Sequence, residues 1–179
     1  MTILTSDLKS GSDSDLVRLG AAGSQLAFGE LVRRHANALR SHMRRLGAQS
    51  HDADDMAQDT FLIAFERLDE FRFEGPFIAW LKTIASRRYV KKLKANHKYL
   101  FVDDMSPYEP PQEPVSKFSQ NDFDEALSYL KPIERLCLSL NLSAGFTHQA
   151  IAEELDMPLG TVKSHIKRGL DHLKQVIIP

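Results

Sequence analysis

A proline-rich segment divides the chain into two parts. Four of its eight prolines fall within residues 107–114, among acidic side chains. Proline has no backbone N–H and cannot continue a helix interior or a central strand, so a segment of this composition forms no packed element. We therefore predict two small domains, at residues 14–97 and 121–179, joined by a flexible acidic linker at residues 98–120.

The first domain carries helical spacing throughout. Apolar residues recur every three to four positions from Phe28 to Leu46 and stop at Gly47, a typical helix C-cap. A second run of this kind spans about residues 50–68, and a third spans about residues 77–94. No window alternates with a period of two between turn signals, so we predict an all-α domain.

The second domain reads as a helix-turn-helix unit. A helix is expected from about residue 121 to 140, with Pro132 as a candidate break. A short helix capped by Thr147, a Pro/Gly turn at residues 156–160 and a last helix over about 161–176 follow. Two short helices joined by such a turn match the DNA-binding motif.

Charge is strongly segregated along the chain, although the formal net charge is only -1. Residues 80–98 hold seven Lys or Arg and no acid, whereas residues 51–79 and 99–125 are acidic. Aromatic residues interleave with the basic block, a combination that suits single-stranded nucleic acid because bases stack on rings. We expect the blocks to form distinct faces for distinct partners, among them nucleic acid.

The last helix carries candidate DNA-reading side chains. Val162 and Ile166 lie on its apolar face, and the polar residues between them are expected to point outward. Cations suit phosphate oxygens, while Ser and His can address base edges in a major groove. The expected outward residues are Lys163, Ser164, His165, Lys167 and Arg168. A solvated surface helix is the alternative interpretation.

The sequence argues against catalysis. Cys137 is the single cysteine, which excludes a disulfide and a cysteine-based zinc cluster and favours a reducing cytoplasm. Asp52, Asp55 and Asp59 run down one helical face without the turn of a calcium loop, so a protein-binding face is favoured over a metal site. No phosphate-cradling loop, nucleophile elbow or membrane-length apolar run is present. We predict no enzyme activity, cofactor, metal, small-molecule substrate or membrane insertion.

Three motifs in a fixed order carry a family resemblance. They are Ala53-Asp54-Asp55-Met56-Ala57-Gln58-Asp59-Thr60-Phe61, then Phe77-x-x-Trp80-Leu81-x-x-Ile84-Ala85, then, after the linker, Ile151-Ala152-x-x-Leu155-x-x-Pro158-x-Gly160-Thr161-Val162-Lys163-Ser164. In this order and spacing, over about residues 14–176, the chain resembles the extracytoplasmic-function (ECF) sigma factors, the two-domain minimal class of bacterial initiation factors. The resemblance implies a region 2-like helical bundle and a region 4-like helix-turn-helix domain.

The resemblance also implies three surfaces and a set of partners. A face that docks on the β′ clamp helices of core RNA polymerase would comprise Asp55, Gln58, Asp59 and Leu62. The reader of the minus-ten promoter element would comprise Arg72, Phe73, Trp80, Lys82, Arg87, Arg88, Lys91, Lys92 and Lys94. The reader of the minus-thirty-five element would comprise Thr147, Thr161, Lys163, Ser164, His165, Lys167 and Arg168. The second domain would also contact the polymerase β flap, and an anti-sigma factor would hold the protein inactive until a signal arrives.

Four departures from the family pattern keep two other functions open. Arg87 stands where the family usually has Asn, Lys91 where it often has Asp, Ala150 where it often has Glu, and His165 where it has Arg. One alternative is a sigma-like decoy that sequesters an anti-sigma factor without reading DNA. The other is a helix-turn-helix regulator with a helical effector domain.

Overall fold

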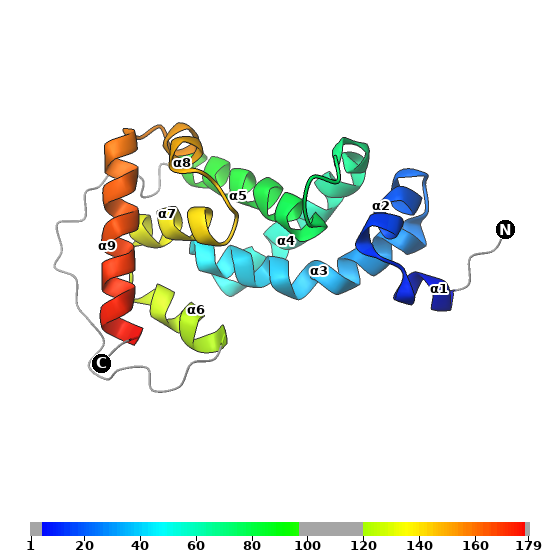
Figure 1. The fold of residues 1–179 in the computed structure, drawn as a ribbon, viewed down its shortest axis with the longest axis horizontal. Coiled ribbons are helices and arrows are strands. Elements are labelled where there is room, and N and C mark those ends of the chain that lie inside the picture. Colours follow the sequence, from blue (N-terminus) through cyan, green and yellow to red (C-terminus); the bar gives the residue numbers. More distant parts are fainter. Residues whose placement is uncertain (1–4, 97–119, 178–179) are drawn as a thin grey trace.

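The computed structural model describes residues 5–96 and 120–177, so the predicted linker at residues 98–120 lies outside the described residues except for Gln120. The regular elements of the described residues are all helices (Figure 1), which confirms the all-α prediction. The elements are α1 (Thr5–Ser10), α2 (Asp13–Ala21), α3 (Gln25–Leu46), α4 (Ser50–Glu66), the 3-10 turn η1 (Leu68–Glu70), α5 (Phe77–Ala95), α6 (Gln120–Ser128), α7 (Pro132–Leu142), α8 (His148–Leu155) and α9 (Leu159–Ile177).

The long helix α3 is the centre of the N-terminal unit, and α2, α4 and α5 pack against it. It begins where the Ser24 hydroxyl accepts a hydrogen bond from the Ala27 N–H at 3.3 Å. It ends at Gly47, whose φ of 112° is the left-handed conformation that glycine adopts without strain. The predicted C-cap at Gly47 is therefore confirmed.

Helices α1 and α2 were not predicted. Both pack against α3, at the end away from α7 and α9 (Figure 1). The Ser12 hydroxyl caps α2 by accepting from the Asp15 N–H at 3.2 Å. The Arg34 guanidinium, on α3, donates to the carbonyl of Gly11 at 2.8 Å and also binds the last carbonyls of α1. A Ser-x-x-Asp pattern before an apolar run was the available sequence signal for α2.

The second unit contains one more helix than the sequence predicted. The expected helix at residues 121–140 is two helices, because Pro132 is the first residue of α7. Proline suits that position, since its missing N–H would have no partner in the first turn. Thr147 caps α8 as predicted, its hydroxyl accepting from the Ala150 N–H at 3.1 Å. Helix α9 begins two residues before the predicted Thr161.

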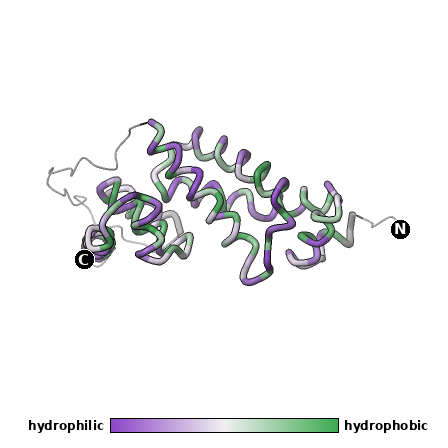
Figure 2. Tube along the Cα trace, turned by 90° about the horizontal axis from the view of Figure 1, so that it is seen from above, coloured by the Kyte–Doolittle hydropathy of each residue, from purple (hydrophilic) through white to green (hydrophobic). Residues whose placement is uncertain are grey.

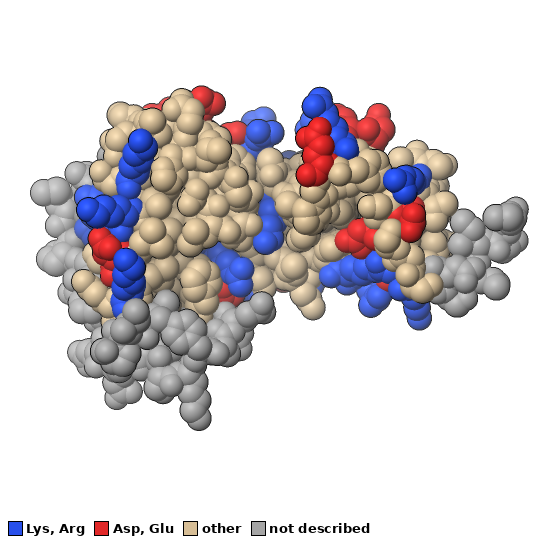
Figure 3. All heavy atoms as spheres, in the orientation of Figure 1, with Lys and Arg blue, Asp and Glu red and all other residues tan. Residues whose placement is uncertain are grey.

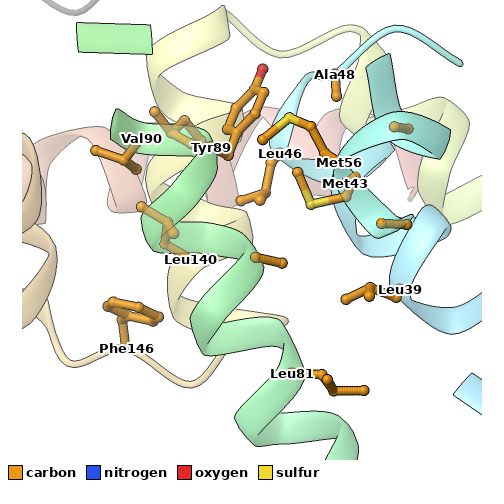
Figure 4. Close-up of a cluster of buried hydrophobic side chains, with 14 of the residues drawn as sticks. Leu39, Met43, Leu46, Ala48, Met56, Leu81, Tyr89, Val90, Leu140 and Phe146 are labelled. Atoms are coloured by element: carbon orange, nitrogen blue, oxygen red, sulfur yellow. The ribbon is translucent and has the colours of Figure 1, made fainter. Parts of the chain in front are cut away.

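The two units pack against each other, α7 on α3 and α8 on α5. Val90 of α5 and Leu140 of α7 belong to one buried cluster (Figure 4). Ser139 and Arg135, both on α7, donate to the carbonyl of Arg45 at 2.9 and 3.0 Å. That carbonyl lies in the last turn of α3, where the helix itself supplies no donor, so α7 completes the end of α3.

Hydrophilic and hydrophobic residues alternate along the helices (Figure 2), so each helix has an apolar side to bury. Every helix in the described part of the chain is too short or too polar to cross a membrane. Within the same part, no three metal-ligating side chains gather into a potential metal site.

Candidate functional site

Helix α9 presents a polar row on the outside of the second unit. Lys163, Ser164 and Lys167 are exposed, while Val162 and Ile166 are buried against the core. Basic side chains mark the edge of the molecule formed by α9, with acidic atoms among them (Figure 3). The Ser164 hydroxyl donates to the Gly160 carbonyl at 2.9 Å, so its oxygen remains available as an acceptor. This row has the chemistry to meet phosphates and base edges.

The prediction that His165 points outward is wrong. Its side chain belongs to the inward side of α9, with residues 162, 166 and 169, and His165 is only 6% exposed. Its Nδ1 atom lies 2.9 Å from an Nη atom of Arg168, one turn further along the helix. The apolar face is wider than Val162 and Ile166 alone suggested, and His165 falls within it.

A buried carboxylate beneath α9 escaped the sequence analysis. Glu134, on α7, is 1% exposed, and its two oxygens face α9. One accepts from Nδ1 of His172 at 2.9 Å, and the other lies 3.4 Å from Nε of Arg168. The only sequence signal was an acid inside the apolar run of residues 133–140, which does not indicate a partner.

The segment before α5 carries an aromatic cluster. Phe73 has a φ of 58°, unusual for a residue other than glycine, and its ring is 43% exposed. The Arg18 guanidinium lies 5.0 Å from the centre of that ring. Trp80 is half-buried, its ring centre 5.6 Å from that of Phe71, so it belongs partly to the core. With exposed Arg72 beside it, the Phe73 ring lies next to two arginine side chains, Arg18 and Arg72.

The basic side of α5 and the acidic side of α4 are partners of each other. Arg88 pairs with Asp59, and Lys92 pairs with Asp52 at 2.7 Å. The expectation of separate faces is therefore wrong for these residues, because α4 and α5 lie side by side. Asp59, one of the predicted docking residues, is therefore already paired with a cation of α5.

Two further α5 cations pair with the second unit. Arg87 lies 3.0 Å from Glu154 of α8, and Lys94 lies 2.5 Å from Asp156, which follows α8. Lys91 is exposed. Lys82 is half-buried, and this burial, together with the nearby Arg45 charge, lowers its pKa. The predicted minus-ten cations of α5 thus differ in their surroundings: two pair with α4, two pair with the second unit, one is exposed and one is half-buried.

The remaining docking residues share an exposed face of α4. Asp55, Gln58 and Leu62 are all exposed, and Leu62 is 64% so. Leu62 and exposed Phe65 line an open apolar groove of about 290 Å³ between α3 and α4. Exposed apolar residues next to polar ones mark surfaces that bind other proteins.

The two helical units resemble proteins of one family. The family models for Sigma-70 region 2 and Sigma-70 region 4 match residues 31–99 and 120–173. The chain is 30% identical over 167 residues to RNA polymerase sigma factor NccH of Alcaligenes xylosoxydans xylosoxydans, a match that covers 88% of the chain and 90% of NccH. It is 28% identical to RNA polymerase sigma factor CnrH of Cupriavidus metallidurans, covering 93% of the chain and 94% of CnrH.

Two solved structures share the fold. CnrH in complex with the cytosolic domain of CnrY has a TM-score of 0.50 at 27% identity, covering 91% of the chain and 95% of CnrH. The sigma factor RpoE in complex with the anti-sigma factor NepR from Bartonella quintana has a TM-score of 0.53 at 24% identity, covering 83% and 95%. The Sigma-70 region 2 model matches the first helical unit and the region 4 model matches the second. NccH aligns with 88% of the chain. The protein therefore belongs to the ECF sigma factors of the sigma-70 family.

Proposed function

We propose that this sigma factor binds core RNA polymerase and directs initiation at promoters with two separate elements. The observation that carries the proposal is the exposed row of Lys163, Ser164 and Lys167 on α9, in the second helix of the helix-turn-helix. Such a helix enters the major groove, where cations contact phosphates and Ser contacts base edges. This assigns the minus-thirty-five element to α9.

The minus-ten element would be read by the segment before α5 and by α5 itself. Exposed Phe73 offers a stacking surface for an unpaired base, and Arg72 offers a charge for the backbone. Arg87 and Lys94 could join this surface only after they leave Glu154 and Asp156. Promoter reading by these two cations therefore requires their ion pairs with the second unit to open.

Core polymerase would supply the affinity that each unit lacks alone. We assign docking on the β′ clamp helices to Asp55, Gln58 and Leu62, and contact with the β flap to the second unit. Once polymerase holds both units, the second DNA contact becomes intramolecular, so two weak contacts suffice. The protein then acts by binding, without a catalytic step or cofactor, in the cytoplasm where it meets polymerase.

An anti-sigma factor is the regulatory partner that we propose. RpoE forms a complex with an anti-sigma factor, NepR, and CnrH forms one with the cytosolic domain of CnrY. Because this chain shares their fold along most of its length, a partner of that kind would hold it away from polymerase.

In vitro transcription with core polymerase on a library of promoter fragments tests the proposal. We expect transcripts that start downstream of a shared two-part motif only when the protein is present. The double substitution Asp55→Lys and Gln58→Ala should weaken core binding without unfolding, because both side chains are exposed. Glu125→Lys, on an exposed position of α6, is the matched control. A folded protein that supports no transcription would overturn the proposal in favour of the decoy.

A further inference from the structure

We propose that Glu134 and His165 are positioning residues that fix the guanidinium of Arg168 for DNA reading. The proposal rests on the proposed function of α9. Neither residue faces the solvent, so neither is expected to touch DNA itself. Their effect on DNA would pass through Arg168, whose side chain is 52% exposed.

Arg168 is held at two separate atoms. Its Nε lies 3.4 Å from one oxygen of Glu134, and one of its Nη atoms donates to Nδ1 of His165 at 2.9 Å. Because guanidinium only donates hydrogen bonds, Nδ1 of His165 must carry no proton in this arrangement. Two contacts at different nitrogen atoms restrict the plane of the guanidinium as well as its position.

Glu134 is itself anchored, so it can serve as a fixed reference for α9. It is 1% exposed, and its second oxygen accepts from Nδ1 of His172, one turn beyond Arg168. Both oxygens of a carboxylate on α7 are thus used by side chains of α9. A buried carboxylate with this set of partners holds a defined geometry, because losing either partner would leave a buried charge less well compensated.

The contacts of Glu134 and His165 with Arg168 should favour binding to a specific base over non-specific attraction to the DNA backbone. A solvated Arg side chain samples many rotamers, and a fixed one loses less of this freedom when it binds a base edge. At the same time the Glu134 charge offsets the Arg168 charge and weakens its attraction to any phosphate. The contacts with Arg168 should therefore raise the ratio of specific to non-specific DNA binding and leave non-specific binding no stronger.

The test compares two DNA fragments bound by the holoenzyme. One is a promoter fragment selected from a random library by core polymerase with the wild-type chain, and the other is the same fragment with its upstream element scrambled. Glu134→Ala should lower the affinity ratio about tenfold, the worth of one good base contact, without lowering affinity for the scrambled fragment. In an Arg168→Ala background, Glu134→Ala should change the ratio no further.

A conservative pair at position 165 separates positioning from packing. His165→Asn keeps an acceptor near the place of Nδ1 and should retain the ratio, whereas His165→Leu fills the buried space without an acceptor and should lose it. Asp171→Ala, which removes an exposed acid 3.8 Å from Lys174 on the same helix, is the control and should leave the ratio unchanged. If Glu134→Ala does not fold, the affinity ratios of the two His165 variants and of Glu134→Gln test the proposal instead.

Three outcomes would overturn the proposal. A parallel fall in affinity for both fragments would mean that Glu134 only maintains the fold. Additive losses in the Glu134→Ala, Arg168→Ala double variant would mean that the two residues act separately. A wild-type holoenzyme that selects no upstream element would refute the assignment of α9 as a DNA reader, and this inference with it.

Discussion

The Nδ1 atom of His42 lies 2.9 Å from the hydroxyl of Ser143. This contact connects α3 of the first unit with the end of α7 in the second. The Nε2 atom of His42 lies 2.8 Å from the Ser86 hydroxyl on α5. His42 has no exposed surface. Burial, assisted by the positive charges of Lys82 and Arg45, lowers its pKa from 6.5 to about 3. The packed arrangement of the two units therefore contains a neutral histidine.

Acid should separate the two units. Because the pKa of His42 is depressed from 6.5, the packed state is fully favoured above pH 6.5 and loses stability as the pH falls toward 3. The loss is at most about 1.4 kcal/mol for each pH unit, if separation gives His42 an ordinary pKa. Small-angle scattering should show a larger radius of gyration at about pH 5.5 than at about pH 7.5.

The variant His42→Gln is the control for this pH response, since glutamine can bond to the serine hydroxyls but does not titrate in this range. Its radius of gyration should be nearly constant over the same range. An equal expansion in wild type and variant would show that another group is responsible.

Neutralising the acids that cover α5 should expose its cations to DNA. Glu154→Gln and Asp156→Asn remove the ion pairs with Arg87 and Lys94 while keeping side-chain size. Asn also tolerates the left-handed conformation of residue 156, whose φ is 52°. Exposed pairs contribute about 0.2–1 kcal/mol each, so with both pairs removed the affinity for a single-stranded oligonucleotide, measured by fluorescence anisotropy, should rise roughly two- to thirtyfold.

A neighbouring acid provides the matched control for that experiment. Glu153 lies on the same helix, is exposed, and accepts from Gln149 of α8 at 2.9 Å. Glu153→Gln changes the net charge by the same amount as either single substitution without touching α5. If it raises DNA affinity as much, net charge and not the α5–α8 contact explains the effect.

Thr147 should contribute to stability as a helix cap. Its hydroxyl accepts from the Ala150 N–H at the start of α8, and Thr147→Ala leaves that donor without this partner. The free energy of unfolding, measured with urea, should fall by about 1 kcal/mol. Thr147→Ser keeps the capping hydroxyl, so the free energy of unfolding should fall much less for this variant. A stable Thr147→Ala protein with weakened promoter binding would instead support the predicted DNA contact.

Local signals explain what could be predicted, and tertiary packing explains the rest. Gly47 and Thr147 end and begin helices through their own backbone and side-chain chemistry, so the sequence identified both. The inward turn of His165 depends on how α9 lies on α7, which helical spacing does not specify. The pairing of Arg87 with Glu154 joins residues far apart in the chain, which counting charges along the sequence does not bring together. The sequence thus located the elements of the site but not which of its charges are already paired.

The exposed row on α9 should determine how DNA binding by the holoenzyme depends on salt. Lys163 is exposed and does not belong to the apolar core. Lys163→Ala should therefore remove one phosphate contact and leave the fold intact. The slope of log affinity against log salt concentration should then fall by about one, with similar losses on different promoter sequences. Lys174→Ala serves as the control, because Lys174 is an exposed cation nearer the end of the same helix and lies 3.8 Å from Asp171. An unchanged slope for Lys163→Ala, or an equal change for Lys174→Ala, would contradict the placement of Lys163 against the DNA backbone.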